Sequence, residues 1–244
     1  MKCAVIGGTG LIGSQVVRIL NAAGHEAVPH SQSTGVDVIS GRGLAEAVAG
    51  ADVVVNLTNS PTFDEASPAF FQTSMENLLA AAGEGGVGHF VILSIVGTDQ
   101  VPELAYYRAK TLQEHLLADG PIPYSIVRAT QFMEFMDAAM SWTSDGDTVR
   151  LPATPIQPIA AGDVAAAVAE VAAGTPLNGI RNIAGPEILT LDELGRITLS
   201  HQGDHRTVVT DPTAGMFAVV KGDVLTDKGA HLAPTRYTDW LARP

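Results

Sequence analysis

Gly7-Gly8-Thr9-Gly10-Leu11-Ile12-Gly13 is the stretch of the sequence that decides the fold. It follows a short apolar run at residues 3–6 and precedes a segment, residues 11–23, whose apolar residues recur at helical spacing. A glycine-rich turn between a strand and a helix suits a pyrophosphate, because free backbone N–H groups and the positive end of the helix dipole meet there. The alternative is a glycine-rich turn that binds no ligand.

The three glycines at the motif positions of this loop have separate expected roles. Gly7 permits the tight turn, Gly10 allows the backbone to approach a phosphate closely, and Gly13 allows the helix to pack on the strand. Strand, turn and helix also stand in the order that dinucleotide binding requires. We therefore expect a dinucleotide to bind at the start of the first helix.

The first 130 residues continue this alternation of short apolar runs and helix-period segments. Further strands are expected at residues 26–30, 52–57, 89–94 and 124–128, and further helices at residues 43–49, 68–82 and 106–118. Such alternation is typical of a parallel sheet covered by helices on both faces. We expect an α/β, Rossmann-type doubly wound parallel sheet with a dinucleotide-binding core over residues 1–130.

The rhythm weakens after Ala129, and residues 131–244 are expected to form a small C-terminal substrate lobe with elements that return to the main sheet. In this part we expect helices at residues 131–142 and 190–200 and strands at residues 148–151 and 180–183. Asp163 is expected to cap an Ala-rich helix rather than to act as a catalytic acid. Thr190 begins a Thr-Leu-Asp-Glu sequence with the spacing of a capping box.

Composition excludes several classes of protein. Fourteen Lys and Arg residues against 26 Asp and Glu residues give a net charge of −12, which would repel nucleic acid. The single cysteine, Cys3, can form no intramolecular disulfide, and the seven histidines lack the spacing of a metal site. No apolar run approaches the roughly 18 residues that span a bilayer. We expect a cytoplasmic protein that binds a small-molecule substrate, without metal, membrane or nucleic acid; its oligomeric state is unknown at this stage.

The glycine loop resembles the Gly-x-x-Gly-x-x-Gly loop of extended and atypical short-chain dehydrogenases, especially the NmrA-like group of NAD(P)H-binding proteins. The resemblance extends over nearly the whole chain, through the segments Asn56-Leu57-Thr58-Asn59, Leu93-Ser94-Ile95-Val96-Gly97, Tyr106-Tyr107-Arg108-Ala109-Lys110 and Ile126-Val127-Arg128-Ala129-Thr130-Gln131-Phe132. It implies a bound nicotinamide cofactor. The residues expected to contact that cofactor are Gly7, Thr9, Gly10, Leu11, Ile12, Gly13, Ser31, Ser33, Asp37, Val38, Leu57, Thr58 and Lys110.

The segment after the second strand bears on the choice of cofactor. An NAD site usually has an acidic residue about 20 residues past the glycines, which holds the ribose 2′-hydroxyl. Here the segment is His30-Ser31-Gln32-Ser33-Thr34, and the first carboxylate is Asp37. NADP is therefore favoured and NAD stays possible, since the segment also lacks an Arg or Lys for the 2′-phosphate. Asp37-Val38 is similar to the family's pair beside the adenine, although Asp37 can equally be an ordinary loop residue.

Tyr106 and Lys110 are the candidate catalytic pair. They stand four residues apart, so on a helix they share one face. A phenol titrates near about 10, and a neighbouring ammonium favours the phenolate, which would bring Tyr106 closer to a useful range for acid–base chemistry. Ser94, at the carboxyl end of a strand, is expected to orient the reacting oxygen. The alternatives are that Tyr107 is the functional phenol and that Ser94 simply ends its strand.

Phe132 and Phe135 are the candidate substrate residues, in a segment that could wall an apolar pocket or belong to the core. The resemblance implies an NADP-dependent oxidoreductase that transfers a hydride to a small carbonyl, quinone or conjugated substrate. In such an enzyme Tyr106 would supply a proton, Lys110 would tune the pKa of Tyr106 and Ser94 would orient the substrate. The alternatives are a redox-sensing NAD(P)-binding protein without turnover and an epimerase with transient use of NAD.

Overall fold

The computed structural model of the protein describes residues 1–243. The chain divides into two compact units. Unit 1 consists of Met1–Arg128 and Val164–Arg181, and unit 2 consists of Ala129–Asp163 and the chain from Asn182 onward. Residues 164–181 thus rejoin the unit that the beginning of the chain forms.

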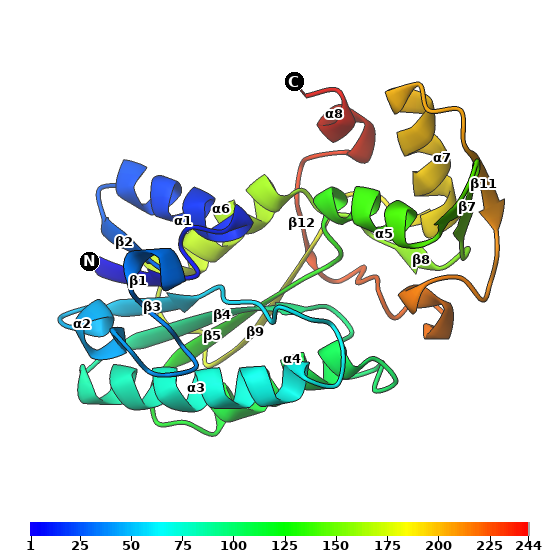
Figure 1. Ribbon diagram of the computed structural model, residues 1–244. Coiled ribbons are helices and arrows are strands. Elements are labelled where there is room, and N and C mark those ends of the chain that lie inside the picture. The colour runs from blue at the N-terminus through cyan, green and yellow to red at the C-terminus, as the bar shows by residue number, and fades with distance from the viewer. Residues whose placement is uncertain (244) are drawn as a thin grey trace. The chain divides into compact units, whose positions relative to one another are not determined.

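A parallel sheet of seven strands lies at the centre of the fold (Figure 1). Its order is β12-β9-β5-β4-β3-β1-β2. The strands are β1 (Lys2–Ile6), β2 (Glu26–His30), β3 (Val53–Asn56), β4 (His89–Ile95), β5 (Tyr124–Ala129), β9 (Gly179–Ala184) and β12 (His231–Leu232). The expected doubly wound α/β fold is confirmed, and the first five strands lie within a residue or two of their expected positions.

The order of the strands places the functional edge of this sheet. From β1 the chain adds β2 on one side and β3, β4 and β5 on the other, so the winding direction reverses between β1 and β3. In open parallel sheets ligands bind beyond the carboxyl ends of the strands at such a switch point. Ile6 pairs with Asn56 at this place, and the residues that follow them are Gly7 and Leu57.

Helices cover both faces of the sheet in unit 1 (Figure 1). α1 (Leu11–Ala22) and α6 (Ala161–Ala173) lie on one face, and α3 (Ser67–Glu84) and α4 (Ala105–Ala118) lie on the other. The short helix α2 (Leu44–Val48) precedes β3. Because both faces are covered, Val53, Val54 and Val55 of β3 are buried on both sides of the sheet.

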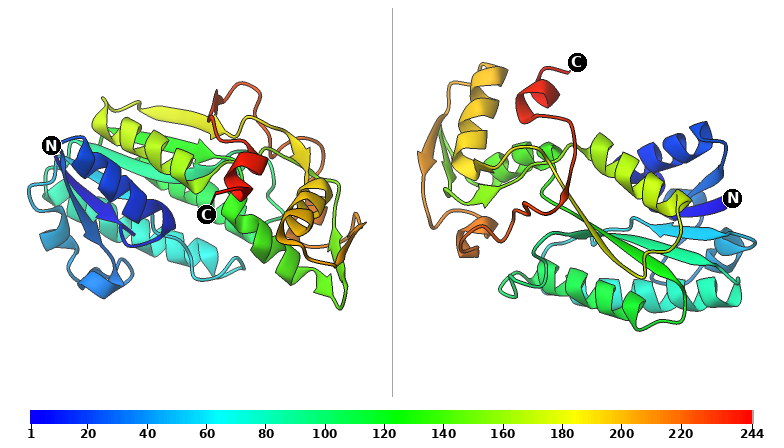
Figure 2. Two further views of the ribbon diagram at one scale, coloured as in Figure 1. Left: turned by 90° about the horizontal axis from the view of Figure 1, so that it is seen from above. Right: turned by 180° about the vertical axis from the view of Figure 1, so that it is seen from behind.

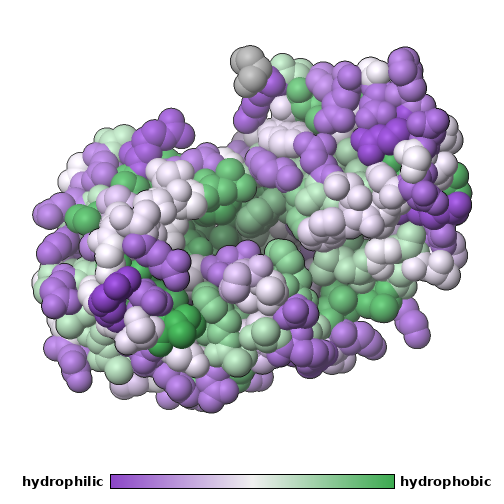
Figure 3. Space-filling model, in the orientation of Figure 1, coloured by the Kyte–Doolittle hydropathy of each residue, from purple (hydrophilic) through white to green (hydrophobic). Residues whose placement is uncertain are grey.

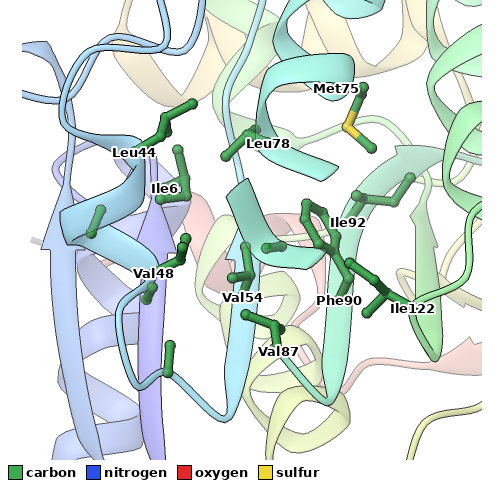
Figure 4. Close-up of a cluster of buried hydrophobic side chains, with 14 of the residues drawn as sticks. Ile6, Leu44, Val48, Val54, Met75, Leu78, Val87, Phe90, Ile92 and Ile122 are labelled. Carbon is green, nitrogen blue, oxygen red and sulfur yellow. The ribbon is translucent and has the colours of Figure 1, made fainter. Parts of the chain in front are cut away.

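A continuous apolar core lies between the sheet and the helices α2 and α3 (Figure 4). Ile6, Val54 and Phe90 come from the strands, whereas Leu44 and Leu78 come from the helices, and all five are buried. Burial of one such side chain stabilises the fold by about 1.5–3 kcal/mol. This core holds the ends of β1 and β3 in fixed positions.

Unit 2 is built around a small sheet of its own (Figure 2). Three strands pair in the order β11-β7-β6, and two more, β10 and β8, form a second small sheet. The elements are α5 (Met136–Trp142), β6 (Ser144–Asp145), β7 (Thr148–Leu151), β8 (Pro155–Ile156), β10 (Leu189–Thr190), α7 (Leu191–Gln202), β11 (Thr207–Thr210) and α8 (Tyr237–Leu241).

Short 3₁₀ turns at Gln32–Thr34, Met133–Phe135 and Met216–Val219 complete the description. The turn at Met133–Phe135 shortens a helix that was expected at residues 131–142. Only the part of this segment from Met136 onward is α-helical. The start of that segment is extended instead, with Phe132 bridged to Ile159.

Of two expected helix caps, the one at Asp163 is wrong. α6 begins at Ala161, so Asp163 lies in its first turn, and the Asp163 carboxylate accepts a hydrogen bond from the Thr235 amide at 3.2 Å. The Ala161 amide donates instead to the Glu134 carboxylate. Thr190 is the N-cap residue of α7, as expected, but the capping-box bond does not form, because its hydroxyl donates to Asp192 Oδ1 at 2.6 Å. At α6 a carboxylate from elsewhere in the chain replaced the local cap.

Within residues 1–243, no helix combines the length and the apolar character needed to cross a bilayer. The same residues contain no group of three His, Cys, Asp or Glu side chains placed to hold a metal ion. Figure 3 shows hydrophilic residues spread widely over one face of the molecule, with apolar areas among them.

Candidate functional site

The glycine loop is shaped by close backbone contacts. Gly7 has a φ of +79°, and a Cβ atom there would lie 2.8 Å from the carbonyl carbon and oxygen of Leu57. A Cβ atom at Gly13 would lie 2.2 Å from the Gly7 oxygen. At Gly10 the nearest atom would be the Gly7 oxygen at 3.3 Å. Gly7 and Gly13 are therefore glycines because of the fold, whereas a methyl group at Gly10 would require the Gly7 oxygen to move by only a few tenths of an ångström.

Gly8 also requires glycine, which the sequence analysis missed. A Cβ atom at this position would lie 2.6 Å from the Val5 oxygen and 2.7 Å from the Pro29 Cα atom. The amides of Gly7 and Gly8 both donate to the His30 carbonyl, at 2.8 and 3.2 Å. The doubled glycine was the available signal: it lets the loop cross closely over the end of β2.

The start of α1 offers unpaired amide groups. Its N-cap residue is Gly10, no side chain caps it, and its first turn contains no acidic residue. Within residues 1–243 the amides of Leu11, Ile12 and Gly13 find no acceptor, and the first bond in this turn runs from Ser14 N to Gly10 O at 3.0 Å. These N–H groups and the helix dipole carry about half a positive charge. The residues present fit a diphosphate group.

The end of β3 lies against this loop. The Leu57 amide donates to the Ile6 carbonyl at 2.8 Å. The Thr58 amide and hydroxyl both donate to Asn56 Oδ1, at 3.1 and 2.8 Å. Asn56 is buried and its amide donates to the Met75 sulfur at 3.4 Å. Leu57 and Thr58 are thus held beside Gly7, at the switch point of the sheet.

The segment after β2 forms a small polar turn. Ser31 and Ser33 share a hydrogen bond between their hydroxyls at 2.8 Å, and the Ser31 amide donates to the Thr34 hydroxyl at 2.8 Å. Asp37 Oδ1 accepts a hydrogen bond from the Ile39 amide at 2.9 Å. Val38, which follows Asp37, is buried.

Arg42 is a cation at this turn that the sequence analysis missed. The Asp37 amide donates to the Arg42 carbonyl at 2.9 Å, which closes the loop. The hydrogen bond from the Ile39 amide lowers the pKa of Asp37, and the positive charge of Arg42 lowers it further. Arg42 is exposed. It lies eight residues beyond Thr34, the end of the segment in which a basic residue for the 2′-phosphate was expected.

Tyr106 is positioned by the loop that follows β3. Its hydroxyl donates to Asn59 Oδ1 at 2.5 Å. Its ring makes edge contacts with Phe63 and Phe71, at centroid distances of 4.9 and 6.0 Å. Burial raises the pKa of Tyr106, and the neighbouring Tyr107 raises it further. The phenol is therefore neutral at neutral pH.

Tyr107 has a different environment. Its side chain is 3% exposed, and its backbone carbonyl accepts a hydrogen bond from the Thr98 hydroxyl at 2.9 Å. Tyr106, in contrast, is only partly buried. The two phenols that the sequence analysis left as alternatives thus differ in their access to solvent.

Lys110 points into the protein, with an exposure of 4%. Its ammonium donates to the Leu93 carbonyl at 2.7 Å and to Gln113 Oε1, and lies 4.7 Å from the centroid of the Phe71 ring. Burial lowers the pKa of Lys110 to about 7, although Glu114 opposes the shift. The expectation that Lys110 lowers the pKa of Tyr106 is wrong, because that pKa is raised and the ammonium is bound to other groups.

Ser94 is a buried hydroxyl in β4, with an exposure of 3%. Its Oγ atom has no hydrogen-bond partner in the described part of the chain. A buried polar atom without a partner costs about 1–3 kcal/mol, so such atoms often mark a ligand or water position. The residue before it, Leu93, is the one whose carbonyl Lys110 holds.

Phe71 connects the candidate residues, since its ring contacts both Tyr106 and Lys110. Phe71 and Gln113 had no signal in the sequence, and Asn59 had none beyond its place in the segment Asn56-Leu57-Thr58-Asn59, because each acts through a partner that only folding brings near. Phe132 and Phe135 lie in unit 2, where Phe135 makes edge contacts with Trp142 and Phe217 at 5.3 and 6.0 Å. Their role in a substrate pocket stays a prediction.

Comparisons with known proteins agree with this geometry. The model of a family described as NAD(P)H-binding matches residues 7–174. The photosystem II assembly factor Ycf39 of Synechocystis is 27% identical over 151 residues, which are 55% of this chain and 46% of that protein. The chain spans about half the length of this curated relative.

Solved structures share the fold. A nucleoside-diphosphate-sugar epimerase from Staphylococcus aureus is 17% identical with a TM-score of 0.76, and the match covers 100% of both chains. A dTDP-glucose 4,6-dehydratase from Streptomyces venezuelae, solved with NAD bound, is 21% identical with a TM-score of 0.72, over 86% of this chain and 85% of that chain. At these identities the likeness concerns the fold alone.

Proposed function

The chain belongs to the NAD(P)H-binding family, and we propose that it is an oxidoreductase that reduces a small carbonyl, quinone or conjugated substrate. The observation that carries the proposal is the start of α1, where the amides of Leu11, Ile12 and Gly13 are unpaired beside the close-packed glycine loop. Thr9 and Gly10 complete the loop that would hold the diphosphate. When bound, the nicotinamide supplies a hydride.

Other residues at the same edge of the sheet would hold the rest of the cofactor. Leu57 and Thr58 lie beside Gly7 and would flank the centre of the dinucleotide. Ser31, Ser33, Asp37 and Val38 would bind its adenosine end. We propose NADP as the preferred form, because the serine hydroxyls can donate to a 2′-phosphate and Arg42 adds a positive charge near Asp37.

Tyr106 is the proposed proton donor. Its hydroxyl is neutral and only partly buried, so it can give its proton to the substrate oxygen as the carbonyl is reduced. The unpaired Ser94 hydroxyl would donate a hydrogen bond to the same oxygen. Lys110 donates to the Leu93 carbonyl and Gln113 and so holds the end of β4, and the third N–H group of its ammonium would donate to the cofactor.

The test is oxidation of NADPH by the wild type and by Tyr106→Phe over a panel of quinones and aldehydes. We expect the variant to lose at least tenfold in kcat with at least one acceptor, since general acid catalysis contributes about 10²–10⁴. Equal rates would remove Tyr106 from the mechanism. Tyr107→Phe is the matched control and should keep its activity.

A redox sensor that binds NAD(P)H without turnover is the second candidate. The specific observation in its favour is that both candidate residues already form hydrogen bonds within the protein. Lys110 donates to the Leu93 carbonyl and Gln113, and Tyr106 donates to Asn59. Calorimetric titration with NADPH, run beside the turnover panel, separates the two functions. Tight binding without oxidation by any acceptor would favour the sensor.

A further inference from the structure

Asn59 has one side-chain partner within residues 1–243, the hydroxyl of Tyr106. It is exposed and lies three residues after the end of β3, whereas Tyr106 lies in the first turn of α4. Its Nδ2 atom donates no hydrogen bond to residues 1–243. The amide can therefore turn about its Cβ–Cγ bond without breaking another hydrogen bond.

The loop around Asn59 is tied to the start of α4 by further contacts. Phe63 packs edge-on against the Tyr106 ring at 4.9 Å. Glu65 receives two hydrogen bonds from Arg108 Nη2, at 2.6 and 2.7 Å, and Arg108 Nη1 also donates to the Pro102 carbonyl at 2.6 Å. The phenol of Tyr106 thus has a defined place beside Asn59.

A phenol and a phenolate need opposite partners. The neutral hydroxyl donates a proton, so it requires an acceptor such as Oδ1. The phenolate accepts, so it requires a donor such as Nδ2. A carboxamide carries both groups on one rotatable unit, whereas a carboxylate offers acceptors only.

Among residues 1–243, no other polar side chain forms a hydrogen bond with the Tyr106 hydroxyl. The Lys110 ammonium donates to the Leu93 carbonyl and Gln113 and lies against the Phe71 ring, and Arg108 is paired with Glu65. Tyr107, its neighbour on α4, disfavours a charge on Tyr106. Asn59 is the polar side chain that reaches the hydroxyl.

We propose that Asn59 is a positioning residue for the proton donor Tyr106, and that its carboxamide serves both states of the phenol by turning from Oδ1 to Nδ2. The proposal rests on the oxidoreductase function proposed above. In the step, the Tyr106 O–H bond breaks as its proton forms a new O–H bond on the substrate oxygen. The phenolate then accepts a hydrogen bond from Asn59 Nδ2 until water returns a proton to it.

The test follows the ionisation of the phenol directly. The four tyrosines are replaced by 3-fluorotyrosine, whose phenol is more acidic, so that the titration falls in an accessible range of pH. Fluorine NMR separates the signals, and Tyr106→Phe and Tyr107→Phe assign two of them. In parallel, nitrogen-15 spectra follow the side-chain amide of Asn59, assigned by its loss in Asn59→Asp.

We expect the Asn59 amide signal of the wild type to shift with the same midpoint as the fluorine signal of residue 106. Asn59→Asp, which keeps the acceptor and lacks the donor, should raise that midpoint by about one pH unit more than Gln72→Glu, since hydrogen bonds to charged groups are roughly twice as strong as neutral ones. Gln72 is exposed on α3 next to Phe71 and bonds Glu76, so this control adds the same charge without touching the phenol.

An Asn59 amide signal that stays constant through the titration of Tyr106 would overturn the proposal. So would a midpoint in Asn59→Asp no higher than in Gln72→Glu. The titration needs no substrate, so it can fail or succeed independently of turnover. Absence of NADPH oxidation with every acceptor would refute the proposed function and leave the pairing of Asn59 with Tyr106 standing.

Discussion

Gly10→Ala separates cofactor binding from folding. The backbone at Gly10 has a φ of −79° and a ψ of −178°, which alanine adopts without strain. Its new Cβ atom would meet only the Gly7 oxygen, at 3.3 Å. Exchange of glycine for alanine at a helix N-cap costs under about 1 kcal/mol. For a chain of this size the expected fall in Tm is therefore at most about 4 °C.

The effect on the cofactor should be larger. If the backbone at Gly10 approaches a phosphate, a methyl group there keeps the diphosphate away from the amides of α1. We expect the Kd for NADPH to rise at least tenfold, which corresponds to about 1.4 kcal/mol. Calorimetric titration measures the Kd, and thermal unfolding of the same samples measures the Tm.

Gly83→Ala is the matched control, because it lies within α3 and its Cβ atom would have no neighbour within 4 Å. It should bind NADPH like the wild type and gain about 0.5–1 kcal/mol of stability. Wild-type affinity in a well-folded Gly10→Ala variant would refute the assignment of the start of α1 as the phosphate site.

Four further predictions use other parts of unit 1. Gly13→Ala, whose Cβ atom would lie 2.2 Å from the Gly7 oxygen, should cost about 1–3 kcal/mol of stability as well as NADPH binding, and a Tm equal to that of the wild type would contradict this. Arg42→Ala should raise the Kd for NADPH about tenfold while leaving that for NADH unchanged; an equal loss for both cofactors would argue against a contact with the 2′-phosphate. The pKa of Lys110 is lowered from 10.5 to about 7 in the folded protein, so the unfolded chain binds this proton more tightly. The contribution of Lys110 to the free energy of unfolding should therefore rise between pH 7 and pH 10.5, by up to about 1.4 kcal/mol per pH unit. Denaturant unfolding at several pH values should show that rise in the wild type and its loss in Lys110→Met. Burial lowers the pKa of His89 below 6.5, so the free energy of unfolding should fall as the pH drops below 6.5. His89→Gln, whose amide can still bond the Ser125 hydroxyl, should make this dependence on pH less steep. An unchanged dependence would show that other groups cause it.

The fold was largely predictable because its signals are local. Alternating apolar runs and helix-period segments depend on residues within a few positions of one another, and they located the first five strands and the helices between them. The glycine loop was equally readable, since a tight turn before a helix limits the residues that fit. The wrong cap at Asp163 has the opposite cause, because Glu134, 27 residues before Ala161, took the place of a local cap.

The candidate site was predictable only in part. Spacing placed Tyr106 and Lys110 one helical turn apart, but it gave no information about what each side chain meets across the fold. Lys110 meets the Leu93 carbonyl, 17 residues away, and Tyr106 meets Asn59, 47 residues away. Burial then changes the pKa of both groups in directions that a spacing argument does not supply.

The sequence alone therefore determined the family of fold and the place where a diphosphate fits, because strand, turn and helix are built from neighbouring residues. The tertiary structure alone decided which partners hold the phenol and the ammonium, and that Gly8 leaves no room for a side chain. Those contacts depend on distances between segments far apart in the chain, which only the packing of helices against the sheet establishes.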